Sequence, residues 1–352
     1  MRDVLRQLAE LEPGDVPVLS IYLDMRPQAT GQNPALRSGR IVLKDRLREI
    51  EKTLGPRGPD LASFCADKDR VEQYLDAEVP SACEGVAIFA CHARRLFTVI
   101  PTGVPFENQV SAVAMPDLFQ LARLLDEQET AVVALMDSNT ARLFVRRTGA
   151  LEEAGGPDDE SVHYRKRSTG GWSQAQYQRH IDKHRADFAR EAAAQIEQLI
   201  DREGATRLIL AGDEVAMTPL QDALSPRALA LLEGEPLRLD IRTPPDAVAS
   251  EVAPLLARAE AEEASSIGDR LIGAIRAGGL GVIGLEATQK ALEYGQADTL
   301  VLDVDAPFDH ETRSHLVRHA TITSADVEVV KGHERLGELG GVGALLRYPF
   351  LE

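Results

Sequence analysis

The sequence predicts a three-domain α/β protein, and three observations support this fold class. The chain has 352 residues, which is more than a single hydrophobic core usually organises. Short apolar runs typical of strands alternate with amphipathic stretches typical of helices along most of the chain. Boundary signals near residue 126 and at Pro244-Pro245 divide this pattern. We therefore expect domains at 1–126, 127–245 and 246–352.

The composition indicates a globular protein of a reducing compartment. Apolar residues make up 44% of the chain and charged residues 27%, as in ordinary soluble domains. The three cysteines are odd in number and form no C-x-x-C pair, so neither a disulfide framework nor a zinc site is expected. We find no apolar signal-peptide core and no run of about 18 apolar residues. We expect a cytoplasmic protein without membrane contact, metal or cofactor.

The first segment, 1–126, is expected to form an α/β unit. Its expected elements are a strand at 16–23, a helix at 33–54, a hairpin of strands at 85–90 and 96–100, and a helix at 116–126. The helix at 33–54 is basic and carries Arg37, Arg40, Lys44, Arg46 and Arg48. Two interpretations of this run stay open: a solvated helix face, which is the usual role of such charges, or a contact for RNA.

The second segment, 127–245, is expected to place a long loop between a strand pair and a long helix. Strands are expected at 131–136, 141–145, 208–211 and 237–241, with the loop at 149–173. Apolar residues at helical spacing predict the helix, which is expected to end at Gly204. These residues are Tyr177, Ile181, Phe188, Ala192, Ile196 and Leu199.

The third segment, 246–352, is expected to begin with an Ala- and Glu-rich helix. This helix is expected at 246–276, with Pro254 as a start or a kink and Gly278-Gly279 as its end. Further helices are expected at 285–294 and 312–320, and strands at 299–304, 327–330 and 342–347. Alternation of helices and strands predicts an α/β sandwich.

A basic island in the second segment is the strongest functional feature. Residues 163–190 contain seven lysines and arginines against two aspartates, on a chain with a formal net charge of −17. Local positive charge on an acidic protein is typical of a contact for a polyanion such as RNA. At its centre lies the sequence Gly170-Gly171-Trp172-Ser173-Gln174, where paired glycines allow the backbone to approach a partner closely. We expect this stretch to be the functional end of the chain.

Two motifs near the C-terminus resemble a known family. Residues 281–300, which contain G-V-I-G-L-E-A and A-L-E-Y-G-Q-A-D-T-L, and residues 339–349, L-G-G-V-G-A-L-L-R-Y-P, resemble the C-terminal domain of the archaeal and eukaryotic class-1 peptide-chain release factors and Pelota. That domain has a fold like a kink-turn-binding ribosomal protein. The second segment is similar to the family's RNase H-like central domain, which carries a Gly-Gly-Gln loop. The chain thus resembles bacterial relatives of this superfamily, and its loop resembles that of the tRNA-releasing factor of ribosome quality control.

The resemblance implies a factor that acts in the ribosomal A-site region and releases peptide from peptidyl-tRNA through loop 163–180. Gln174 would position a water or the tRNA end, while Gly170 and Gly171 would permit close approach to rRNA. RNA contacts are expected from Arg165, Lys166, Arg167, Trp172, Gln176, Arg179 and Lys183. The ribosome and tRNA are the expected partners, and a translational GTPase is a further candidate.

The loop departs from the family pattern, because Trp172 and Ser173 stand between the glycine pair and Gln174. This spacing weakens a direct transfer of stop-codon hydrolysis, and no stop-codon-reading motif occurs in 1–125. A simpler interpretation is also open. Ser173 and Gln176 match a capping box for the following helix, in which case the glycines are only a hinge.

Three functions therefore stay open. We expect a peptidyl-tRNA hydrolase type of activity, although the residues alone leave open whether the protein is an enzyme. The alternatives are a non-catalytic hibernation factor that occupies the A site, favoured by the irregular loop spacing, and a nuclease that cuts the tRNA 3′ end. No metal chemistry is expected, since His180 and His184 lack the glutamate of an H-E-x-x-H motif and a third ligand.

Overall fold

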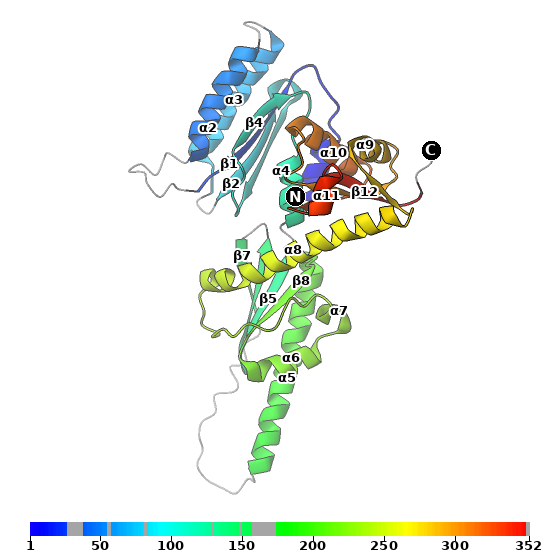
Figure 1. Cartoon of the computed structure of the whole chain (residues 1–352). Coiled ribbons are helices and arrows are strands. Elements are labelled where there is room, and N and C mark those ends of the chain that lie inside the picture. Colours follow the sequence, from blue (N-terminus) through cyan, green and yellow to red (C-terminus); the bar gives the residue numbers. More distant parts are fainter. Residues whose placement is uncertain are drawn as a thin grey trace. The chain divides into compact units, whose positions relative to one another are not determined.

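The computed structural model describes residues 1–26, 38–54, 58–80, 83–127, 130–147, 150–156 and 174–349, and of Ser38 and 174–182 it describes the backbone only. These residues form three four-stranded sheets flanked by helices (Figure 1), which confirms the expected multi-domain α/β fold. The chain divides into two compact units, unit 1 (1–127 with 261–352) and unit 2 (128–260). Each sheet lies in its own expected segment, and the domain boundaries near 126 and 245 stay a prediction.

The N-terminal sheet of unit 1 is antiparallel, in the order β3-β2-β1-β4. Its strands are β1 (Val18–Asp24), β2 (Gly85–Cys91), β3 (Leu96–Thr102) and β4 (Gln109–Val113), with the short helix η1 (His92–Arg94) between β2 and β3. One face packs on α2 (Ser38–Thr53) and α3 (Pro59–Ala77). The other face shares a core with α1 (Arg2–Ala9) and α4 (Phe119–Glu127). The expected strand, hairpin and last helix are confirmed, whereas α1, α3 and β4 have no counterpart among the expected elements.

The C-terminal sheet of unit 1 has the order β11-β10-β12-β9, with β10 and β11 parallel and the other pairs antiparallel. Its elements are β9 (Gly281–Ile283), α9 (Leu285–Glu293), β10 (Ala297–Asp303), α10 (His310–Ile322), β11 (Asp326–Val330), α11 (Glu334–Glu338) and β12 (Val342–Leu346). A single hydrophobic core joins side chains of β10 and α10 to Tyr22 and Phe89 of the N-terminal sheet. The two ends of the chain therefore fold into one unit.

The sheet of unit 2 has the order β7-β6-β5-β8, with β5 and β8 parallel. Its elements are β5 (Ala131–Met136), β6 (Ala141–Arg147), β7 (Ala150–Gly155), α5 (Gln174–Glu203), β8 (Arg207–Gly212), α6 (Glu214–Ala223) and α7 (Pro226–Leu229). Two expectations were wrong. Residues 150–155, expected in the loop, form β7, because their carboxylates pair with arginines of β6. Residues 237–241, expected as a strand, make a single bridge to β8 through Leu237.

A 32-residue helix, α8 (Pro245–Arg276), passes from unit 2 into unit 1. Val252 and Leu256 are buried in the core of unit 2, and Ile267 and Leu271 in the core of unit 1. Pro254, expected as a start or a kink, lies inside the helix. Its missing N–H does not end the helix, because buried side chains two residues on either side hold both flanks in the core.

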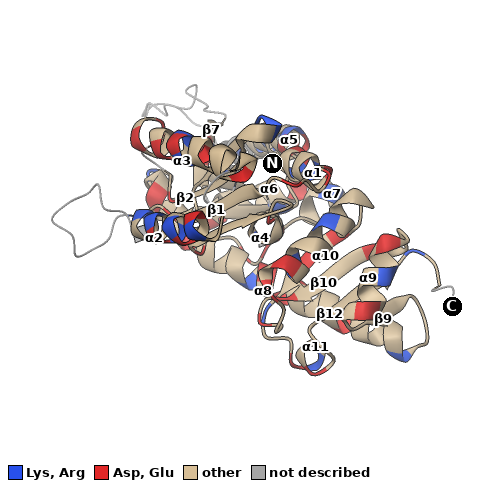
Figure 2. Ribbon diagram, turned by 90° about the horizontal axis from the view of Figure 1, so that it is seen from above, with Lys and Arg blue, Asp and Glu red and all other residues tan. Residues whose placement is uncertain are grey.

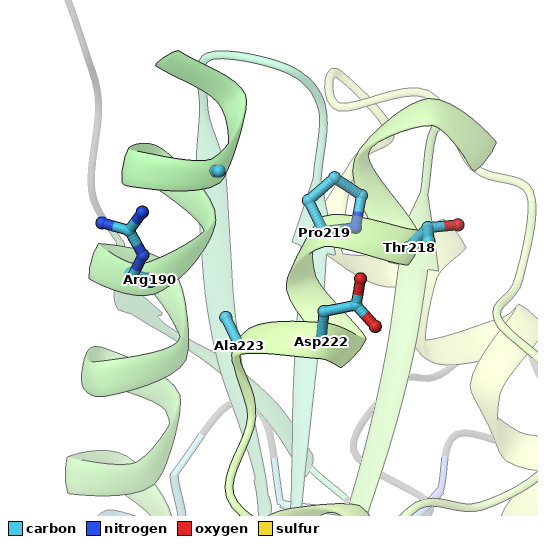
Figure 3. Close-up of a pocket in the computed structure, with 6 residues that line it drawn as sticks. Arg190, Thr218, Pro219, Asp222 and Ala223 are labelled. Carbon is cyan, nitrogen blue, oxygen red and sulfur yellow. The ribbon is translucent and has the colours of Figure 1, made fainter. Parts of the chain in front are cut away.

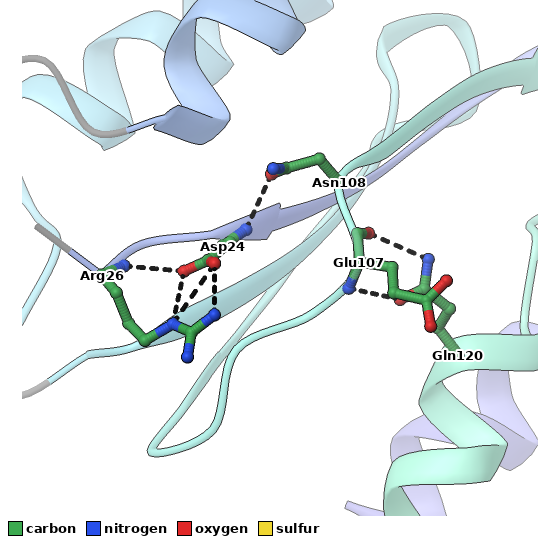
Figure 4. Close-up of polar contacts among 5 residues, drawn as sticks. All are labelled: Asp24, Arg26, Glu107, Asn108 and Gln120. Carbon is green, nitrogen blue, oxygen red and sulfur yellow. Dashed lines mark hydrogen bonds and ion pairs between the residues drawn. The ribbon is translucent and has the colours of Figure 1, made fainter. Parts of the chain in front are cut away.

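The turn before β4 connects three elements of unit 1 (Figure 4). Asn108 Oδ1 accepts a hydrogen bond from the backbone N–H of Asp24 at 2.8 Å, at the end of β1. The guanidinium of Arg26 contacts both carboxylate oxygens of Asp24, and its hydrogen bond lowers the pKa of that carboxyl. Gln120 of α4 accepts a bond from Glu107 N at 3.0 Å and donates one to Glu107 O at 3.1 Å. The ends of β1 and β4 are thereby linked to α4.

Asp117 is the central buried polar residue of unit 1, at 3% exposure. Its carboxylate accepts hydrogen bonds from Phe119 N at 3.3 Å and from the Gln109 side chain. Its backbone N–H donates to Ser20 Oγ at 3.0 Å, and its carbonyl accepts from the Tyr22 hydroxyl at 2.6 Å. Burial raises the pKa of Asp117, against smaller lowering effects of these donors.

We expect Asp117 to make the stability of the protein depend on pH. A carboxyl with a raised folded-state pKa contributes most below its unfolded-state pKa, and this contribution is lost as pH rises through the folded-state pKa. The Asp117→Asn variant should lack this decline in the free energy of unfolding, measured by urea titration from acid to neutral pH. The exposed Asp69→Asn variant should keep the wild-type profile. An unchanged pH slope in Asp117→Asn would contradict the assignment.

Candidate functional site

The expected functional end of the chain leads into the first turns of α5. Six of the expected site residues lie outside the described residues: Arg165, Lys166, Arg167, Gly170, Gly171 and Trp172. α5 begins at Gln174, so Gln174 and Gln176 lie in its first turn and Arg179 in its second, with backbone alone described. The cap expected at Ser173 lies outside the described residues and stays a prediction. Lys183 is described and exposed.

The helix α5 has two unlike halves. Its 30 residues span about 45 Å, roughly twice the length of a six-residue strand. The described side chains at 183–187 are exposed or half-buried, and full burial begins at Phe188. The buried residues are Phe188, Ala189, Ala192, Ala193, Ile196, Leu199 and Ile200. The C-terminal half is therefore packed in the core of unit 2, while the N-terminal half extends beyond the sheet (Figure 1).

Ionic contacts hold the packed half of α5 at its C-terminal end. Arg147, at the end of β6, binds the Glu203 carboxylate with two guanidinium nitrogens, one of them at 3.0 Å. This hydrogen bonding lowers the pKa of Glu203. One turn and a half earlier, the Glu197 carboxylate accepts the backbone N–H of Ser225 at 2.8 Å. The helix is thereby tied both to the sheet and to the connection before α7.

Arg142 connects three chain segments of the same unit. Its Nε and Nη2 atoms bind the two carboxylate oxygens of Glu153 on β7 at 2.7 and 2.8 Å. Its Nη1 atom donates to the carbonyls of Ile241 and Thr243 at 2.9 and 2.7 Å. Hydrogen bonding from Arg142 lowers the pKa of Glu153. One guanidinium thus fastens β6 to β7 and to the chain that leads into α8.

An open pocket of about 440 Å³ lies between α5 and α6 (Figure 3). It is lined by Ala186 and Arg190 of α5 and by Thr218, Pro219, Asp222 and Ala223 of α6. Arg190 is the last cation of the basic island, and Asp187 binds it at 2.7 Å. Sequence patterns gave no sign of this pocket, since it exists only where two helices from different parts of the segment pair.

Neither a cluster of metal ligands nor a membrane-spanning helix is found among the described residues. No group of three or more His, Cys, Asp or Glu side chains among them is placed to hold a metal ion. None of the helices in the described ranges is long and apolar enough to cross a membrane. The side chains of Gln174, Gln176 and Arg179 are not among those described, so their expected RNA contacts stay predictions.

A known protein family matches the part of the chain that contains this site. Residues 116–260 match the model of a family described as bacterial archaeo-eukaryotic release factor family 10. The match covers the sheet of unit 2, α5 and the loop before it. This description agrees with the resemblance of the second segment to the central domain of release factors. No curated protein matches the sequence of the chain significantly.

Solved structures of an archaeal termination factor and of Pelota-type proteins are similar to the chain at low identity. An archaeal translation termination factor, aRF1, is 17% identical, with 98% of this chain and 96% of that chain covered and a TM-score of 0.28. Pelota from Archaeoglobus fulgidus is 18% identical, with 76% and 80% covered and a TM-score of 0.37. Dom34 from S. cerevisiae is 10% identical, with 76% and 82% covered and a TM-score of 0.44.

Phe188 should be the residue at which α5 is first held by the core. The Phe188→Ala variant should lower the free energy of unfolding by about 3–5 kcal/mol, because it leaves a cavity in a close-packed interior. The exposed Lys183→Ala variant, nearer the loop, should change it by less than about 0.5 kcal/mol. Denaturant unfolding followed by circular dichroism measures both. A loss below about 1 kcal/mol in Phe188→Ala would show that the helix is held elsewhere.

Proposed function

We propose that the chain is a ribosome-associated release or rescue factor that carries loop 163–180 to the 3′ end of tRNA. The observation that carries this proposal is the division of α5. Its C-terminal half is packed in the core of unit 2 and held by Arg147, and its N-terminal half extends beyond the sheet. The family match to bacterial archaeo-eukaryotic release factors over 116–260 supports it.

Peptide release requires a water molecule held in line with the ester carbonyl of peptidyl-tRNA. Small errors in position cost large factors in rate, so the group that positions the water needs a rigid support. Gln174 is the first residue of α5, and the core holds the same helix from Phe188 onward. A glutamine amide can donate to one partner and accept from another without titrating. Gln174 is therefore the proposed positioning group.

The charge distribution supports entry of this end of the molecule into an RNA environment. The whole chain carries a formal net charge of −17, so most of its surface repels RNA. Residues 163–190 contain the positive charges that oppose this repulsion. The N-terminus of α5 adds a partial positive charge that favours phosphate. Electrostatic attraction of RNA is thus concentrated at the loop. The rest of unit 2 serves to support the loop.

Gln174→Ala should abolish release of peptide from peptidyl-tRNA while leaving ribosome binding intact. The change removes the positioning amide and none of the basic residues. Gln198→Ala is the matched control, because Gln198 is an exposed glutamine on the same helix, far from the loop. Release is measured as deacylation of labelled peptidyl-tRNA on stalled large subunits, and binding by cosedimentation. Equal release by Gln174→Ala and Gln198→Ala would refute a positioning role for Gln174.

The fate of tRNA should separate the three functions that the sequence leaves open. Stalled large subunits incubated with the protein are expected to yield full-length deacylated tRNA, resolved on an acid gel. The irregular glycine-to-Gln174 spacing favours the second candidate, an occupancy factor, which would leave peptidyl-tRNA intact. A nuclease would shorten the tRNA 3′ end. Either of these outcomes would overturn the release activity.

A further inference from the structure

The basic helix α2 of unit 1 plays no part in the proposed release chemistry. Leu43 and Leu47 are buried on its inner side, against the N-terminal sheet. Arg40 is a link within the unit, because its guanidinium pairs with Asp76 of α3 at 2.7 Å and donates to the carbonyl of Leu75. The sequence left open whether the other cations of this helix are a solvated face or an RNA contact. In the structure, these cations differ in the side of the helix on which they lie and in whether they pair with a carboxylate.

Three exposed cations form a stripe along α2, the Lys44 stripe, made of Lys44, Arg48 and Lys52. They follow one another at intervals of four residues, so each is displaced by about 6 Å along the helix axis and turned by about 40°. Figure 2 shows α2 as a helix rich in Lys and Arg. An interval of this size is of the same order as the distance between successive phosphates of an RNA strand.

The acidic residues of α2 leave this stripe largely uncompensated. Glu49 binds Arg46, on another side of the helix, at 2.7 Å, and Glu51 binds Lys68 of α3 at 3.3 Å. Asp45 lies next to the stripe, and its contact with Arg48 is long, at 3.8 Å. Within the described ranges, the ion pairs of unit 1 include none for the other two cations of the stripe.

We propose that the Lys44 stripe binds the phosphate backbone of a single RNA strand. An exposed apolar side chain, Ile41 at 49% exposure, lies on the same face one turn before Lys44 and can contact a ribose or a base. A membrane surface fits less well, because an interfacial helix needs a broad apolar face and Ile41 stands alone there. This contact goes beyond the proposed release function, since it lies in unit 1 and does not use loop 163–180.

The salt dependence of RNA binding tests the stripe. Fluorescence anisotropy of a labelled single-stranded RNA of mixed sequence is measured with the full chain over a range of salt concentrations. The variant Lys44→Gln/Arg48→Gln/Lys52→Gln should bind at least about tenfold more weakly at low salt. Its slope of log affinity against log salt should be smaller by about 2, because three phosphate contacts to a single strand contribute about 0.7 each.

A charge-matched variant separates the stripe from net charge. Arg202→Gln/Arg227→Gln/Arg238→Gln removes the same three positive charges from exposed, paired arginines of unit 2, and it should keep the wild-type slope. An equal loss in both triple variants would overturn the proposal. So would a wild-type chain that does not bind the RNA, or one whose binding is unchanged by the stripe variant. Loss of binding to phosphatidylserine vesicles with RNA binding retained would indicate a lipid contact instead.

The proposals for the Lys44 stripe and for the release loop can be tested independently. Gln174→Ala is expected to keep the RNA affinity and the salt slope of the wild type, while losing release. The stripe variant is expected to lose RNA affinity and to keep the folded far-UV circular dichroism spectrum. Loss of the salt slope in Arg165→Gln/Lys166→Gln/Arg167→Gln, with the stripe variant unaffected, would place the RNA contact at the loop and overturn the stripe.

Discussion

Burial of one half of α5 is the constraint on which unit 2 depends. Seven apolar side chains from Phe188 to Ile200 lie in the core, and the Arg147–Glu203 pair holds the end of the helix. Apolar burial of this kind is the main favourable term in folding, whereas an isolated helix in water is marginal. The packed half therefore stabilises the helix as a whole. The described side chains that precede Phe188, at 183–187, are exposed or half-buried.

Unit 1 combines both ends of the chain, and its interior contains polar groups as well as apolar ones. Asp117 is buried between the N-terminal sheet and α4, and both elements supply hydrogen-bond donors to it. Ser314 of α10 accepts from Leu118 N and donates to Pro116 O, each at 3.0 Å. These bonds join segments nearly 200 residues apart. Satisfied buried polar groups of this kind make one arrangement of the elements preferable to others.

Electrostatics in this chain is a matter of position more than of total charge. An arginine that neighbours a carboxylate, such as Arg142 beside Glu153, serves the fold. Cations such as Lys44, which has no ion pair within the described residues, leave a local positive potential on an acidic protein. The sequence alone does not distinguish paired cations from unpaired ones. The distinction follows from which side chains the fold brings within 4 Å of each other, because the interaction of exposed charges falls off steeply through water.

The sequence by itself determined the α/β class, the extent of α5 up to Gly204 and the basic character of the stretch before it. These are local properties, since helical periodicity and charge can be recognised within a short stretch of consecutive residues. It did not reveal α3, whose buried Ser63 and Asp67 interrupt the apolar pattern. It also placed β7 in a loop, because Glu152 and Glu153 look like solvated charges until β6 supplies their arginines. The tertiary structure alone decided which elements share a core, how the α5–α6 pocket forms and which cations stay unpaired. Each of these depends on contacts between residues far apart in the chain, and no local pattern encodes them.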